Sequence, residues 1–294
     1  MITRLTFWVL IGLGHVALFC AAASAQEEAA DYQKVFDKVA QHNAQIKTGV
    51  FHAHGELKGN PASPYPPIAK LEFFCAFDFH ANKLRFDRRL ESGETLKIAE
   101  YGGGQYVRTP GQTITFPSYL SDIRLDLASR KPPSWIKIID IRALGLCGEG
   151  DIMQSASFDD VLINYRKMER HSIRELGDGL LQLEWIHGRS VRVATLDKNK
   201  SYAVVRHTLM EGKKVEEDHR ITVEKRNDTW VPVGWHSVDS TGEHSAKIDW
   251  KSLNEEVDSK HFTWEDFEIK RAHRVIDSSL PQPVVVKEFA TETK

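Results

Sequence analysis

The sequence predicts an exported α+β protein: an antiparallel sheet with one N-terminal helix and a helical segment inserted in the middle. Three observations lead to this fold class. Residues 1–25 have the composition of an export signal. Residues 31–46 repeat apolar side chains at helical spacing. Most of the remaining chain alternates apolar and polar residues in short segments separated by turns, which is typical of successive β-hairpins.

The export signal begins with one positive charge, Arg4, followed by an apolar stretch from Leu5 to Phe19. Small residues then end in Ala23-Ser24-Ala25, the small-x-small pattern that signal peptidase accepts. The apolar stretch is short for a membrane span. We therefore expect cleavage near Ala25 and a periplasmic or secreted mature protein.

The composition fits one globular domain. The chain has 294 residues, 41% hydrophobic and 27% charged, with a net charge of −2. Because Lys and Arg are interleaved with Asp and Glu, the sequence has no basic face for nucleic acid. We expect a signal peptide at 1–25, one domain at 26–270 with an insertion at about 118–170, and an extended or disordered tail at 271–294.

The predicted elements follow in chain order. The first helix covers 31–46, with Asp31 as its cap and Gly49 after its end. The strongest strand signal comes next, where Phe73, Cys75, Phe77 and Phe79 share one face. Further strands are predicted at 50–57, 84–88, 96–99, 105–108, 113–116, 181–185, 191–193, 202–205, 221–223, 230–235 and 246–250.

The middle of the chain has a different pattern. Pro132-Pro133 interrupts it, and the apolar stretch from Trp135 to Leu146 is compatible with a helix. Residues 157–165 are predicted to form a helix capped by Ser157. We interpret 118–170 as a helical insertion in the sheet domain.

The sequence lacks the common catalytic and metal-binding motifs. It contains no HExxH, CxxC, GxSxG or phosphate-binding loop. His52 and His54 share one face of a predicted strand, but no third ligand is identifiable, so we predict no metal site. Adjacent acidic pairs such as Asp159-Asp160 diverge on any regular element. We therefore predict no catalytic residues, no cofactor and no enzymatic activity.

Two cysteines remain after cleavage, Cys75 and Cys147. In an oxidising compartment they can form a disulfide, which would add about 4 kcal/mol of stability in the chain-entropy model. A buried free thiol at Cys75 is an equal alternative, because Cys75 lies in an apolar strand. The sequence leaves both open.

Aromatic residues carry the remaining functional signal. Six tryptophans follow the signal region, together with the Phe-rich strand. Core packing explains part of this content. The alternative is that a curved sheet lines an apolar pocket with these rings, because one short helix cannot fill the concave side of a large sheet.

Two stretches resemble a known family. One runs from Phe77-Asp78-Phe79 through Gly102-Gly103-Gly104, and the other from Ile248-Asp249-Trp250 through Val275-Ile276-Asp277. With the exported helix, they resemble the LolA-like superfamily of outer-membrane lipoprotein-sorting proteins, which includes LolB-like proteins and the RseB N-terminal domain. One departure is His80-Ala81-Asn82, which stands where the carriers have a latching Arg.

The resemblance implies an antiparallel half-barrel closed by helices, with an apolar concave face that holds acyl chains. The expected ligand is a lipid or an acylated protein, with peripheral membrane contact compatible with that role. The expected lining residues are Val35, Phe36, Val39, Phe73, Phe77, Phe79, Leu84, Phe86, Leu181, Leu183 and Trp185.

A second function remains open on the same fold. The protein would be an envelope sensor or interaction module that binds another envelope protein through its middle segment or an edge strand. An apolar cavity would favour lipid binding, whereas a fully packed core with an exposed apolar patch on 118–170 would favour a protein partner.

Overall fold

The computed structural model describes residues 32–61, 68–91, 103–117, 122–127, 140–146, 158–166, 170–240, 242–267, 272 and 274–289. The predicted signal peptide at 1–25, the strand predicted at 96–99, and Cys147 lie outside these ranges. No helix in the described ranges is long and apolar enough to cross a membrane.

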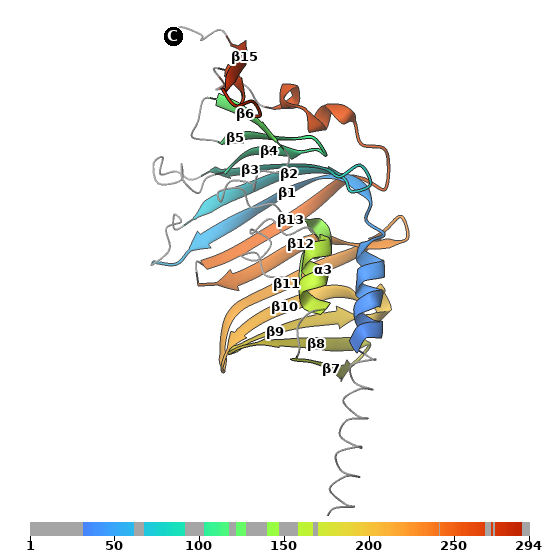
Figure 1. The fold of residues 1–294 in the computed structure, drawn as a ribbon. Helices are drawn as coiled ribbons and strands as arrows, with labels where there is room; N and C mark the ends of the chain where they lie inside the picture. The colour runs from blue at the N-terminus through green and yellow to red at the C-terminus, as the bar shows by residue number, and fades with distance from the viewer. Residues whose placement is uncertain are drawn as a thin grey trace, which may run out of the picture.

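One large sheet dominates the structure (Figure 1). Its fifteen strands lie in the order β15-β14-β6-β5-β4-β3-β2-β1-β13-β12-β11-β10-β9-β8-β7. The strands are β1 (Thr48–Gly59), β2 (Ala69–Asp78), β3 (Lys83–Glu91), β4 (Gly103–Arg108), β5 (Gln112–Pro117), β6 (Asp122–Leu127), β7 (Arg170–Gly177), β8 (Leu180–His187), β9 (Ser190–Asp197), β10 (Ala203–Glu211), β11 (Lys214–Arg226), β12 (Thr229–Asp239), β13 (Gly242–Leu253), β14 (Arg274–Asp277) and β15 (Val284–Glu288).

The predicted fold class, an α+β antiparallel half-barrel with an N-terminal cover helix and a helical middle insertion, is wrong. The sheet is mixed, because β14 pairs with β6 in parallel while the other pairings are antiparallel. Strand content far exceeds helix content in the described residues. The middle segment contributes a strand, β6, to the sheet itself, so it is not a separate helical lobe.

The physical reason lies in short strand signals at the chain's middle and end. In β6, buried Ile123 and Leu125 alternate with Arg124 and Asp126, a period of two. Val275 of β14 is fully buried and pairs with Ile123. Within the segment expected to be an extended or disordered tail, Arg274–Asp277 and Val284–Glu288 add two strands, β14 and β15, to the sheet.

Two described helices lie on the same side of the sheet (Figure 1). The helix predicted over 31–46 spans residues 32–43, and the second helix, α3 (Phe158–Arg166), follows the 3-10 turn η1 (Ile141–Ala143). Tyr32 and Phe36 of the first helix are buried, and Phe36 meets Tyr165 of α3 edge to face. Both helices pack against the larger core, which extends over this face of the sheet from β4 across to β8.

A smaller core lies on the opposite face, between β2–β6 and residues 257–267, with Ala272 and Val275. Two 3-10 turns, η3 (Ser259–Phe262) and η4 (Trp264–Asp266), cover this part of the sheet. Phe262 and Phe267 are buried there with Val107 and Ile114. The segment after β13 therefore returns across the back of the sheet before β14 joins β6.

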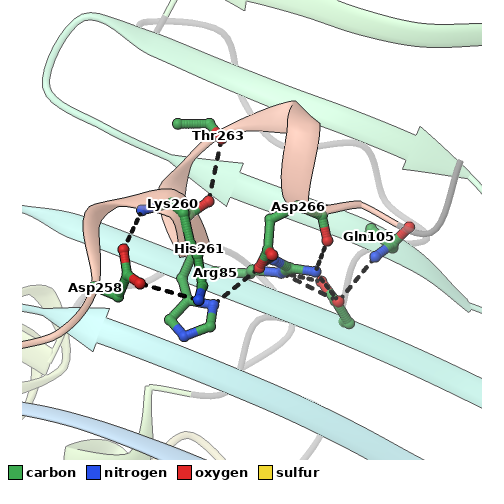
Figure 2. Close-up of polar contacts among 8 residues, drawn as sticks. Arg85, Gln105, Asp258, Lys260, His261, Thr263 and Asp266 are labelled. Atoms are coloured by element: carbon green, nitrogen blue, oxygen red, sulfur yellow. Dashed lines mark hydrogen bonds and ion pairs between the residues drawn. The ribbon is translucent and has the colours of Figure 1, made fainter.

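A buried ion-pair cluster fixes that returning segment to β3 (Figure 2). The guanidinium of Arg85 donates to Asp87 at 2.7 Å and also pairs with Asp266, while Gln105 donates to Asp87 at 2.9 Å. His261 lies 2.9 Å from Asp266. Burial opposes the charge on Arg85, but its bonds to Asp87 and Asp266 outweigh this and raise its pKa. Arg85 therefore anchors the 258–267 segment.

Cys75 is a buried free thiol on β2. It packs among the apolar side chains of the larger core, and burial raises its pKa well above the ordinary thiol value. Cys75 has no disulfide partner among the described residues, and as a neutral thiol it is a poor nucleophile. The predicted disulfide to Cys147 lies outside those residues and stays a prediction.

Candidate functional site

The helix-bearing side of β1, β2, β3, β12 and β13 forms what we call the aromatic face. Its middle strands carry small residues: Gly55 of β1 lies opposite Ala246 of β13. A Cβ atom on Gly55 would lie 1.8 Å from the carbonyl oxygen of Ser245, so only glycine fits there. Because these residues have little or no side chain, the aromatic face is lower over β1 and β13 than over the strands on either side.

Two aromatic rings meet above this lower part of the face. Phe73 of β2 and Trp235 of β12 come from strands on opposite sides of β1 and β13, yet their ring centroids lie 5.7 Å apart. Phe86 of β3 lies 5.5 Å from Phe73 on the other side. All three rings are buried. The face is therefore a continuous band of aromatic side chains.

A buried cation, Arg88 of β3, lies at the margin of the band. It faces Phe73 on one neighbouring strand and Gly104, which has no side chain, on the other. Arg88 is only 3% exposed, and its Nε and Nη2 atoms have no hydrogen-bond partner among the described residues. Because an unpaired buried charge is costly, Arg88 is suited to hold an anionic group.

A row of polar side chains borders the aromatic face on β10 to β13. Cross-strand register places His207 opposite His219, His219 opposite Ser237, and Ser237 opposite His244. All four residues are buried. Since all four occupy the same register position, they form one line across four strands.

Three side chains of this region offer metal-ligand atoms close together: His207, Glu217 and His219, with these atoms within 4.8 Å of one another. The Nε2 atom of His219 lies 3.2 Å from a Glu217 oxygen, and its Nδ1 atom lies 2.7 Å from the Ser237 hydroxyl. In the part of the chain that the structure describes, neither ring nitrogen of His207 has a hydrogen-bond partner. Burial, with smaller effects from His219 and Arg192, lowers the pKa of His207 to about 3.

The residues predicted to line an acyl site fall into two groups. Phe36, Val39, Leu181, Leu183 and Trp185 are buried where the first helix meets the sheet, with Val35 and Phe79 partly buried beside the same core. Phe73, Phe77, Leu84 and Phe86 are buried on β2 and β3. Of these, Phe73 and Phe86 belong to the band beside Arg88; the binding role of the whole set remains a prediction.

His52 and His54 lie on the opposite side of β1 from the aromatic face. Their rings stack at 6.4 Å, and His52 also meets Phe74. His54 is exposed and lies 3.7 Å from Glu72. The cluster of metal-ligand atoms on β10 and β11 does not include them.

Sequence reasoning missed Arg88 and the His207–Glu217–His219 cluster. A hairpin signal for the cluster was present: Gly212 divides two alternating segments, and Glu217 and His219 share one face of the second. The pairing of His207 with His219 depends on a register shift at Leu209/Met210, which the sequence does not reveal.

Comparison with known proteins finds solved structures that are similar to this chain. No protein-family model and no curated protein matches the chain. A DUF1329 family protein from Desulfovibrio piger is 14% identical, with a TM-score of 0.45 over 79% of this chain and 97% of its own. An uncharacterized conserved protein from Thermus thermophilus is 9% identical, with a TM-score of 0.34 over 83% of this chain and 98% of its own.

LprF from Mycobacterium bovis is a third similar structure. It is 10% identical, with a TM-score of 0.28 over 78% of this chain and 95% of its own. Identities this low concern the fold alone, and they do not place the chain in the LolA-like superfamily. The function is therefore argued from the site.

Proposed function

We propose that this protein is an exported, non-enzymatic binding protein for a lipid or an acylated protein, acting as a carrier in the cell envelope. The acyl chain would lie along the aromatic face, and an anionic head group would pair with Arg88. The observation that carries the proposal is the buried guanidinium of Arg88, unpaired at Nε and Nη2, beside a continuous aromatic band.

The energetics of such a ligand are favourable. Burying one CH₂ group is worth about 0.8 kcal/mol, so a sixteen-carbon chain gains roughly 10 kcal/mol before the costs of association. Phe73 and Trp235 are buried, so the chain would enter by parting these two rings above Gly55 and Ala246. Aromatic side chains move as rigid units about two rotatable bonds, so this opening requires no change of strand pairing.

The anionic head group would remove the cost of an unpaired buried cation. A carboxylate or phosphate accepts two parallel hydrogen bonds from a guanidinium, the strongest geometry available to it. A neutral head group offers no such compensation. Specificity for acidic amphiphiles over neutral ones therefore follows from Arg88.

Replacing Arg88 with Met should separate head-group recognition from acyl-chain binding. Palmitate and hexadecanol have the same chain length but differ in charge. We expect Arg88→Met to weaken palmitate binding at least tenfold, since a hydrogen bond to a charged group contributes about 1.5–3 kcal/mol, and to leave hexadecanol binding unchanged. Displacement of a fluorescent fatty acid measures both affinities.

The matched control is Arg206→Met, because Arg206 forms an exposed ion pair with Asp218 on another strand. It should bind both ligands as the unaltered protein does. Equal palmitate affinity in Arg88→Met and Arg206→Met would contradict the assignment of the head-group site. Absence of binding to either amphiphile by the unaltered protein would contradict the function.

A second candidate function, recognition of another envelope protein, is favoured by β15. This strand ends the sheet among the described strands, and Val284, Val285 and Val286 are all exposed. An exposed apolar edge strand can accept a further strand from a partner. It would bind the partner without using the aromatic face.

Val285→Lys is the test of that second function. A charge on the edge strand should abolish capture of a partner from an envelope extract and leave palmitate affinity unchanged, because the four strands β14, β6, β5 and β4 separate β15 from Arg88 on β3. Partner capture that survives Val285→Lys would exclude β15 as the recognition edge.

A further inference from the structure

The cluster at His207, Glu217 and His219 lies outside the acyl site and serves no role in it. Glu217 and His219 are two residues apart on β11, so they share a face, and His207 is the cross-strand neighbour of His219 on β10. The three donors thus come from one hairpin. Two imidazoles and one carboxylate are a donor set that first-row divalent metals prefer.

His207 is the most unusual member of the cluster. Its side chain is fully buried, and neither Nδ1 nor Nε2 has a hydrogen-bond partner within the described ranges. Buried polar groups are nearly always paired, so an unpaired imidazole with a ring nitrogen near two other donors points to a ligand.

His219, the second histidine of the cluster, is already oriented for coordination. Its Nδ1 atom lies 2.7 Å from the Ser237 hydroxyl, and its Nε2 atom lies 3.2 Å from Glu217. When Nδ1–H donates to Ser237, the Nε2 lone pair faces Glu217 and His207. Metal-ligating histidines commonly have their second nitrogen held in this way.

We propose that His207, Glu217 and His219 form a binding site for one Zn²⁺ ion. Zinc lies about 2.0–2.2 Å from nitrogen and oxygen ligands, which places the ligands about 3.4 Å apart. The three donor atoms lie within 4.8 Å of one another. Side-chain rotations that move the donor atoms by about 1 Å therefore complete the geometry. Glu217 supplies a negative charge, and Arg192 is the nearby cation that opposes the ion.

His207 and His219 are buried and the Glu217 side chain is 24% exposed, so the ion would be largely enclosed by protein, and we assign it a structural role. It would join β10 to β11 beneath the 140–146 segment, where a Cβ atom on Gly145 would lie 2.8 Å from both Val204 and Ile221. A ligand that binds only the folded chain raises the unfolding temperature. At a free Zn²⁺ concentration of 100 times Kd, the expected rise is about 5–10 °C.

The experiment uses the full chain after dialysis against EDTA. Isothermal titration with ZnCl₂ should give one site per chain, and MgCl₂ should give none, because Mg²⁺ prefers oxygen ligands. His207→Leu should weaken Zn²⁺ binding at least about 100-fold, and Ser237→Ala about 10-fold. Co²⁺ in place of Zn²⁺ should give the visible absorption of a four-coordinate site in the unaltered protein and lose it in His207→Leu.

The matched control is His236→Gln. His236 lies 3.0 Å from Glu243, a histidine–glutamate pair on the same sheet, but both side chains are nearly half exposed. Its variant should bind Zn²⁺ as the unaltered protein does. Circular dichroism confirms that each variant is folded, and His219→Gln replaces His207→Leu if the latter unfolds.

Two results would overturn the site. One is an unaltered protein with no stoichiometric Zn²⁺ binding and no rise in unfolding temperature. The other is equal Zn²⁺ binding by His207→Leu, His219→Gln and His236→Gln, which would place the ion elsewhere among the thirteen histidines. Palmitate affinity is measured separately, so failure of the metal site leaves the proposed function standing.

Discussion

Replacing Arg85 with Met is expected to lower the free energy of unfolding by about 3–5 kcal/mol, because it leaves the buried carboxylate of Asp87 without its charge partner. Arg85 and Asp87 are each less than a tenth exposed. The same change removes the ion pair to Asp266, which fixes the 258–267 segment to β3. Urea denaturation followed by circular dichroism measures the loss.

Two further variants give this prediction its specificity. Arg85→Met combined with Asp87→Leu should recover much of the lost stability, since replacing both members of a buried pair by apolar residues is often neutral. Arg206→Met removes an exposed pair with Asp218 and should cost less than about 1 kcal/mol. A cost for Arg85→Met no greater than that for Arg206→Met would contradict the anchoring role.

Replacing Trp185 with Ala is expected to lower the free energy of unfolding by about 3–5 kcal/mol, because the indole is fully buried where the first helix meets the sheet. Its ring lies 4.4 Å from that of Tyr165 and 6.4 Å from that of Tyr32. Its Nε1 also donates to the Tyr32 hydroxyl. The variant should therefore release the helix of residues 32–43, seen as faster proteolysis within it.

Trp230→Ala is the matched control for Trp185→Ala. Trp230 is only partly buried, and the ammonium group of Lys200 lies 5.8 Å from the centroid of its ring. Its replacement should lower the free energy of unfolding by less than half as much as Trp185→Ala does, and should leave the helix of residues 32–43 resistant to protease. Equal losses in the free energy of unfolding at the two positions would contradict this prediction and would show that the helix contributes little to the core.

The elements that the sequence predicted well are those with long, regular patterns. The Phe73–Phe79 alternation corresponds to β2, and the apolar repeat of residues 31–46 corresponds to the helix of residues 32–43. In both cases one face is apolar over several residues, so local periodicity specifies the element.

The features that could not be predicted depend on register between distant strands. β6 and β14 have two to three apolar residues each, and their parallel pairing joins positions about 150 residues apart. The Arg85–Asp266 ion pair likewise spans 181 residues. Arg88 carries no sequence signal, because its burial comes from the fold around it rather than from its neighbours in the chain.

Native mass spectrometry of the protein purified after export tests the central claim most directly. The proposed function predicts that the folded chain carries an additional mass corresponding to one acyl ligand, with an acidic head group, and that Arg88→Met loses this mass while Arg206→Met retains it. A folded, exported protein that carries no lipid, and that takes up neither palmitate nor hexadecanol when they are supplied, would contradict it.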